Sequence, residues 1–225
     1  MPIPAPVAVP LLAVVLATVL TLATPAILRR LPIPPDEGEL APFSDLATPG
    51  FRAAVFCCSA VAGTLAFACL PPGEWPAWVG LVTVGALLGL IDLRTTFLPL
   101  RLTYLAVALA VVGAAVSAWL QDSWWVLVTA AAAGALGAGA FWLVWRLSNG
   151  LAFGDVRLAG LIGVVVGTRG GAFAFSAFFL GTLIGAVWGL VLRWRRGVDE
   201  PFAYGPALLL GPLAALVIAR LGLPG

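Results

Sequence analysis

The chain has 225 residues, of which 62% are hydrophobic and 10% are charged, and its formal net charge at pH 7 is +2. Soluble domains carry about 25% charged residues, so this composition excludes a soluble fold and predicts an all-α, polytopic integral membrane protein. There is no histidine, which removes the usual metal ligand and the usual general base at neutral pH.

Eight apolar stretches, separated by polar or Pro/Gly-rich breaks, are the predicted transmembrane helices of a single membrane domain, residues 1–225. A helix that crosses a membrane needs about 20 mostly apolar residues. The first stretch has no basic residue before it and is too long for the apolar part of a signal peptide, so we expect a first helix with its N-terminus outside. The predicted spans are residues 7–28, 53–70, 77–91, 102–120, 124–145, 158–167, 172–192 and 205–221.

The sixth stretch is shorter than a normal span, and the positions of the arginines decide how to treat it. Joined to the seventh stretch, it would form a straight helix about 52 Å long, against a hydrocarbon core of roughly 30 Å. As a separate span it leaves every arginine except Arg169 and Arg220 on the cytoplasmic side, as the positive-inside rule favours. We therefore expect a short sixth helix.

The longest loop, residues 29–52, is proline-rich and acidic, and we expect it to be cytoplasmic and too small to form a domain. All three cysteines lie in the second predicted span without a CxxC pair, which predicts packed thiols instead of a zinc site, and no cofactor is expected. Most acidic residues are interpreted as solvated loop or turn charges. These are Asp36, Glu37, Glu39, Asp45, Glu74, Asp122, Asp199 and Glu200.

The two remaining acidic residues adjoin apolar helices. Asp92 ends the third predicted span in LLGLIDLRTTFLPLRLT, and Asp155 opens the sixth in LAFGDVRLAGLIG. Because two spans separate them, both carboxylates should lie at the same membrane boundary, whichever way the protein is oriented. Each is followed two residues later by an arginine, Arg94 or Arg157, so one interpretation is two helix-boundary charges paired with arginines. Asp155 would also suit the positive end of a helix dipole.

The second interpretation of Asp92 and Asp155 is a catalytic dyad. Two close carboxylates cannot both ionise at low cost, so they share a proton. One then acts as a base on water, while the protonated partner donates to a scissile carbonyl. This aspartyl-protease chemistry needs no histidine, metal or nucleophilic side chain. Gly154, directly before Asp155, would let a substrate backbone come close.

Three stretches resemble motifs of the prepilin peptidases, the type IV leader peptidases. AFGDVRLAGLIG resembles their GxGD-containing signature, roughly GxGDxKLxAxxG. DLRTTFLPLRLT resembles their first aspartate motif, and PFAYGPALLLG a third family segment, in the order in which the family has them. The matching residues are Gly154, Asp155, Leu158 and Gly163 in the signature, Asp92, Arg94, Leu98, Pro99, Leu102 and Thr103 in the first motif, and Pro201, Gly205, Pro206 and Gly211 in the third.

The resemblance implies an intramembrane aspartyl endopeptidase of the inner (cytoplasmic) membrane, with Asp92 and Asp155 as its catalytic pair. It would remove the short basic leader of prepilin or pseudopilin precursors at the cytoplasmic face. Membrane lipid surrounds such a protein, no nucleic acid is expected as a partner, and the sequence leaves the oligomeric state open. Residues expected to bind substrate or shape the loops around the pair are Gly154, Ala152, Arg94, Arg157, Pro99, Tyr204, Gly205 and Pro206.

The chain departs from the family pattern at several positions. Ala152 replaces the first glycine of GxGD, Arg157 stands where lysine is usual, and Leu100 replaces the asparagine after the proline. Bifunctional members carry paired CxxC motifs in the first cytoplasmic loop, linked to N-methylation of the trimmed pilin. The loop at residues 29–52 has no cysteine, so we expect peptidase activity without methyltransferase activity.

Other readings of the same residues stay open. Arg94 and Arg157 also suit topology anchors, and residues 204–206 suit a kinked or capped helix start. An alternative function is a proton-coupled transporter that uses Asp92 and Asp155 as a relay, although no related halves are visible in the chain. A third reading is an inactive family member that acts in pilus assembly.

Overall fold

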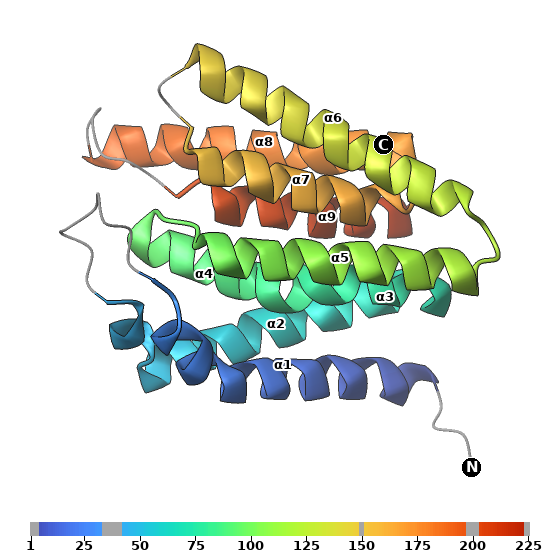
Figure 1. Ribbon diagram of the computed structural model, residues 1–225, viewed down its shortest axis with the longest axis horizontal. Coiled ribbons are helices and arrows are strands. Elements are labelled where there is room, and N and C mark those ends of the chain that lie inside the picture. The colour runs from blue at the N-terminus through green and yellow to red at the C-terminus, as the bar shows by residue number, and fades with distance from the viewer. Residues whose placement is uncertain (1–4, 33–41, 149–150, 197–202, 223–225) are drawn as a thin grey trace.

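The structure is a computed structural model that describes residues 5–32, 42–148, 151–196 and 203–222 (Figure 1). Within these ranges the chain forms helices joined by turns and short loops, as the all-α prediction requires. The α-helices are α1 (Ala5–Arg29), α2 (Pro49–Cys69), α3 (Trp75–Gly80), α4 (Ala86–Thr95), α5 (Leu100–Leu120), α6 (Trp125–Leu147), α7 (Phe153–Gly167), α8 (Gly171–Arg196) and α9 (Gly205–Arg220). The 3-10 turns η1 (Phe43–Leu46) and η2 (Pro72–Glu74) precede α2 and α3.

The predicted spans correspond to helical segments, and the chain is an all-α polytopic membrane protein. Six helical segments of the described chain are long and apolar enough to cross a membrane, at residues 8–29, 49–69, 72–95, 100–120, 125–147 and 171–195. The helices α7 and α9 are shorter, with 15 and 16 residues. The helix α7 begins at Phe153, five residues before the predicted sixth span. Its first turn tolerates Asp155, since a carboxylate is favourable at a helix N-terminus.

The third membrane segment is a continuous helical rod, residues 72–95, in which η3, a π-helical segment at Leu81–Gly85, joins α3 to α4. All five residues of η3 are buried. Ser59 of α2 donates its hydroxyl hydrogen bond to the Val82 carbonyl at 2.8 Å. Irregular helix at membrane depth needs such a partner, because lipid offers none to a freed carbonyl. We call residues 72–95 the α3–α4 rod.

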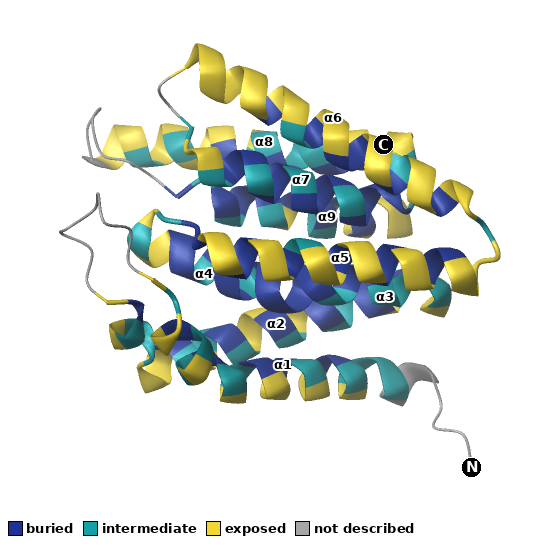
Figure 2. Cartoon of the chain, in the orientation of Figure 1, coloured by how far each residue is buried: buried dark blue, intermediate teal, exposed yellow. Residues whose placement is uncertain are grey.

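The helices pack side by side in pairs, α1 with α2, α3 with α5, α6 with α7, and α8 with α9 (Figure 1). The α3–α4 rod and α7 are mostly buried, whereas the outer faces of α1, α6 and α8 are exposed (Figure 2). Exposed apolar side chains such as Leu136 and Trp194 suit contact with lipid. The helix α7 can be short because protein encloses it instead of the bilayer.

Different sets of helix ends lie at the two ends of the bundle (Figure 1). The C-terminal end of α4 and the N-terminal ends of α5, α7 and α9 lie together at one end, which we call the site end. The connection between α5 and α6 lies at the opposite end, which we call the far end. Asp92, in the last turns of α4, and Asp155, in the first turn of α7, therefore lie at the same end, as the parity argument predicted.

Candidate active site

Asp92 is held at the end of α4 by contacts with two other backbone segments. Its side chain is buried, and Oδ2 accepts a hydrogen bond of 3.0 Å from the backbone N–H of Gly205, the first residue of α9. Its carbonyl accepts a hydrogen bond of 2.7 Å from the N–H of Thr96. Thr96 adopts a left-handed conformation with φ 52°, which ends the helix. The carboxylate thus faces the start of α9.

Asp155 is the third residue of α7 and is also buried. Its Oδ2 accepts a hydrogen bond of 3.2 Å from the backbone N–H of Ala152, while its own N–H donates to the Ala152 carbonyl at 3.0 Å. A carboxylate that reaches back in this way forms half of a capping box and lies at the favourable end of the helix dipole. These contacts orient Asp155 and occupy one of its two oxygens.

Asp92 and Asp155 are both buried at the site end, near enough for the charge of one to act on the other. Gly205 lies close to Asp92 and to Leu158 of α7. A β-carbon on this glycine would lie 2.7 Å from Asp92 Oδ2 and 3.2 Å from Leu158 Cδ2. Leu158 follows Asp155 by about one turn of α7. Two buried carboxyl groups whose charges act on each other favour sharing a proton over carrying two charges. The arrangement can therefore present one base and one acid to a bound molecule.

Gly154 lies against the turn that follows Asp92, so the first two motifs are in contact. A β-carbon at this position would lie 3.0 Å from Leu98 Cβ. The neighbouring Pro99 is buried and precedes the first residue of α5. The space beside Gly154 is therefore filled by Leu98, a packing role that the sequence did not indicate, instead of being left open for a substrate backbone.

The two arginines that follow the aspartates do not neutralise them. Residues two apart in a helix point to nearly opposite faces. Arg94 is exposed, and the Arg157 guanidinium lies over the Phe153 ring, 4.7 Å from its centroid. Within the described part of the chain neither arginine forms an ion pair with Asp92 or Asp155. The interpretation of two charges paired with nearby arginines is therefore wrong.

Residues 204–206 start α9 next to the site. The Tyr204 ring lies where a β-carbon on Gly185 of α8 would be, and packs 6.3 Å from the Phe141 ring between centroids. Burial raises the pKa of the Tyr204 hydroxyl, and the nearby Asp155 carboxylate raises it further. The phenol therefore keeps its proton at neutral pH. Pro206 occupies the second position of the helix, where its missing N–H costs nothing.

The departures from the family pattern leave the contacts of the aspartates intact. Ala152 is exposed and has φ −81° and ψ 151°, an extended conformation that any residue adopts without strain. Leu100 is the first residue of α5, and 43% of it is exposed. Both positions are exposed, whereas Asp92 and Asp155 are buried.

Two apolar grooves open beside the site. One, of about 730 Å³, runs between α6 and α8 from Thr129 to Val144, Leu151 and Tyr204. The other, of about 440 Å³, lies between α2, the α3–α4 rod and α9, and reaches Pro206. Among the residues that the structure describes, no group of three or more cysteine or acidic side chains has the arrangement of a metal site.

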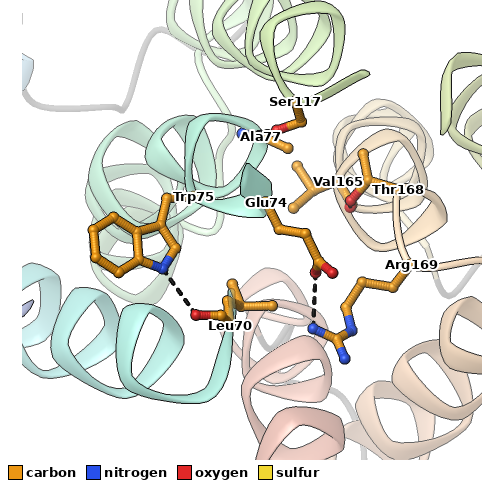
Figure 3. A network of polar contacts seen from close by, with 8 residues as sticks. All are labelled: Leu70, Glu74, Trp75, Ala77, Ser117, Val165, Thr168 and Arg169. Atoms are coloured by element: carbon orange, nitrogen blue, oxygen red, sulfur yellow. Dashed lines mark hydrogen bonds and ion pairs between the residues drawn. The ribbon is translucent and has the colours of Figure 1, made fainter. Parts of the chain in front are cut away.

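The prediction that Glu74 is a solvated charge is wrong, because this carboxylate forms a mostly buried ion pair. Its Oε2 accepts a hydrogen bond of 2.8 Å from Arg169 Nη1 at the far end of the bundle, and the two side chains are 13% and 24% exposed (Figure 3). By contrast, Asp45 and Asp122 are exposed, as predicted. Other predicted positions lie outside the described residues, namely Asp36, Glu37, Glu39, Asp199, Glu200 and Pro201.

Comparisons with known proteins give the same family as the three motifs. The model of the type IV leader peptidase family matches residues 79–190, which include both aspartates. A prepilin leader peptidase/N-methyltransferase of Bacillus subtilis is 33% identical over 96 residues, which cover 42% of this chain and 37% of that protein. The similarity thus spans well under half of that relative's length. No solved structure matches the chain.

Proposed function

Because the chain belongs to the type IV leader peptidase family, we propose that it is an aspartyl endopeptidase whose catalytic residues are Asp92 and Asp155. The observation that carries the proposal is that two buried carboxyl groups, from α4 and α7, lie at the same end of the bundle, where Asp92 accepts a hydrogen bond from the first residue of α9. Buried acidic groups in membrane proteins are costly and usually functional.

The proposed reaction uses one ionised and one protonated carboxyl group. The carboxylate removes a proton from water, and the resulting oxygen nucleophile adds to the scissile carbonyl carbon. The protonated partner donates to the carbonyl oxygen, which gives a neutral tetrahedral diol. Collapse of this diol returns a proton to the leaving nitrogen and breaks the C–N bond. The N–H groups of Gly205 and Ala152 would keep the two carboxyl groups oriented during these transfers.

The substrate in this proposal is a prepilin-like precursor, cut between its basic leader and its apolar helix at the cytoplasmic face. The position of the pair supports this choice, because Asp92 lies in the last turns of α4 and Asp155 in the first turn of α7, at a boundary of the bundle instead of its middle. A bond between a water-soluble leader and a membrane helix would lie at such a boundary. The absence of cysteine from residues 29–52 supports peptidase activity without N-methylation.

The test is cleavage of a leader-bearing precursor by membranes that contain Asp92→Asn or Asp155→Asn protein. Loss of a general acid or base should lower the rate by roughly 10²–10⁴-fold. Asp122→Asn is the control, since this exposed far-end carboxylate is remote from the site and should leave cleavage unchanged. Normal processing by both aspartate variants would refute the proposal. Solute or proton flux that depends on the two aspartates would point to the transporter instead.

A further inference from the structure

The two helices that carry the aspartates are joined a second time, at the far end. In the α3–α4 rod, Glu74 lies at the first turn and Asp92 in the last turns. In α7, Asp155 lies in the first turn, and Arg169 follows just after the last residue. The ion pair between Glu74 and Arg169 therefore links these two helices at the end opposite to the site (Figure 3).

The surroundings of the ion pair hold each partner in place. On the rod, Trp75 Nε1 donates to the Leu70 carbonyl at 3.0 Å, and the Ala77 N–H donates to Ser117 Oγ of α5 at 3.3 Å (Figure 3). On the other side, the Arg169 guanidinium lies 5.0 Å from the centroid of the Phe173 ring. The far end of the rod is thus fixed to α2 and α5, and the ion pair fixes the end of α7 to the rod.

At the site end the aspartates are held differently. Asp92 and Asp155 receive hydrogen bonds from Gly205 and Ala152, and no direct hydrogen bond joins the two carboxyl groups in the described structure. Along the helix axes, Asp92 is about 27 Å from Glu74 and Asp155 about 21 Å from Arg169. A change of about 5° in the angle between the helices at the far end would move the site ends apart by about 2 Å.

We propose that the Glu74–Arg169 ion pair is a positioning contact that sets the separation of Asp92 and Asp155 from the far side of the membrane. The catalytic part of this inference rests on the proposed function. The separation itself does not, because it is measurable in a chain that has no activity. A misplacement of about 1 Å can lower an enzymatic rate about 10²-fold, so a small change in helix angle is enough to matter.

The structural test uses thiols in place of the carboxyl groups. In a chain whose Cys57, Cys58 and Cys69 are replaced by serine, Asp92→Cys and Asp155→Cys are introduced together, and the rate of bridging by a short bifunctional thiol reagent is measured. Adding Glu74→Gln or Arg169→Gln should lower this rate roughly fivefold. The charge-exchanged variant, with Glu74→Arg and Arg169→Glu, should recover most of it, and the Asp122→Asn control should not change it.

The catalytic test uses the chain with its aspartates intact. Glu74→Gln and Arg169→Gln should lower kcat for precursor cleavage roughly 10- to 100-fold with KM nearly unchanged, because binding groups are untouched while the reacting groups are displaced. The charge exchange should restore kcat. Unchanged bridging in both single variants would overturn the proposal, as would an exchanged variant that inserts normally but bridges slowly. If the unmodified chain cleaves no precursor, the peptidase proposal fails while the bridging result still decides this one.

Discussion

At residue 205 the chain has room for no side chain larger than hydrogen. The backbone N–H of Gly205 donates to Asp92, and a β-carbon there would lie 2.7 Å from the accepting oxygen. The atom that must move is a carboxylate oxygen, not the end of a flexible apolar chain. A methyl group would therefore push Asp92 from its position while leaving most of the fold's packing in place.

Gly205→Ala should consequently lower the rate of precursor cleavage about 10²-fold, the cost of a misplacement of about 1 Å. The amount of membrane-inserted protein should change little. Gly139→Ala in α6 is the matched control, because its β-carbon would meet nothing within 4 Å. That variant should keep full activity and gain up to about 1 kcal/mol of helix stability. Equal cleavage rates for the two variants would contradict this role of Gly205.

The GxGD-like signature has two small residues with different steric requirements. Ala152 is exposed in an ordinary extended conformation, whereas Gly154 contacts Leu98. We expect Ala152→Gly to change the cleavage rate less than about twofold and stability by less than about 1 kcal/mol. Gly154→Ala should slow cleavage, because its methyl group would press the Leu98 turn away from α7. Kinetics of the two variants side by side would test the contrast, and a gain of activity in Ala152→Gly would contradict it.

At the scale of the elements, α7 is held mainly through small residues that face α6. A β-carbon on Gly163 would overlap the Ala133 carbonyl, and one on Gly167 would lie 2.6 Å from the Thr129 carbonyl. Small residues let membrane helices approach closely, where van der Waals contacts must replace the hydrophobic effect. Gly163, a residue of the signature, is thus explained by packing and needs no catalytic role.

Gly163→Ala should destabilise the protein by about 1–3 kcal/mol, the usual cost of overpacking a close contact. Gly160→Ala on the same helix is its control, since that β-carbon would lie 3.4 Å from Ala138 Cβ, an ordinary contact. Detergent unfolding monitored by circular dichroism compares the two. A Gly163→Ala protein as stable as the Gly160→Ala protein would show that α6 and α7 can separate at little cost.

At the scale of the molecule, the sequence was most informative about the features that the bilayer restricts, namely the helices and the end of the bundle at which each residue lies. Apolar length predicted the helices, and parity placed Asp92 and Asp155 at one end before any contact was known. The resemblance added Gly205, whose hydrogen bond to Asp92 spans 113 residues of chain. The pairing of Glu74 with Arg169, 95 residues apart, was not predictable, because charge at a predicted outer turn gives no sign of its partner. The filling of Gly154 by Leu98 and the π-helical segment likewise depend on tertiary packing.

The arginines provide the last prediction, the orientation of the whole molecule. Two of the described arginines lie at the far end: Arg169 follows the end of α7, and Arg220 is the last residue of α9 (Figure 1). The others lie on the helix termini at the site end, namely Arg29, Arg30, Arg52, Arg94, Arg101, Arg146, Arg157, Arg193, Arg195 and Arg196. Arginine near membrane helices stays preferentially in the cytoplasm. The site end, with Asp92 and Asp155, should therefore face the cytoplasm and the N-terminus should lie outside.

Labelling of single cysteines in intact cells tests this orientation. In a chain without its native cysteines, Asp122→Cys at the far end and Arg94→Cys at the site end both provide an exposed position. A membrane-impermeant maleimide should label the first in intact cells and the second only after lysis, because it reaches the outer face alone. The reverse pattern would place the aspartates outside, where no cytoplasmic precursor could reach them. It would then exclude leader cleavage at the inner face even if the two carboxyl groups proved to act as a pair.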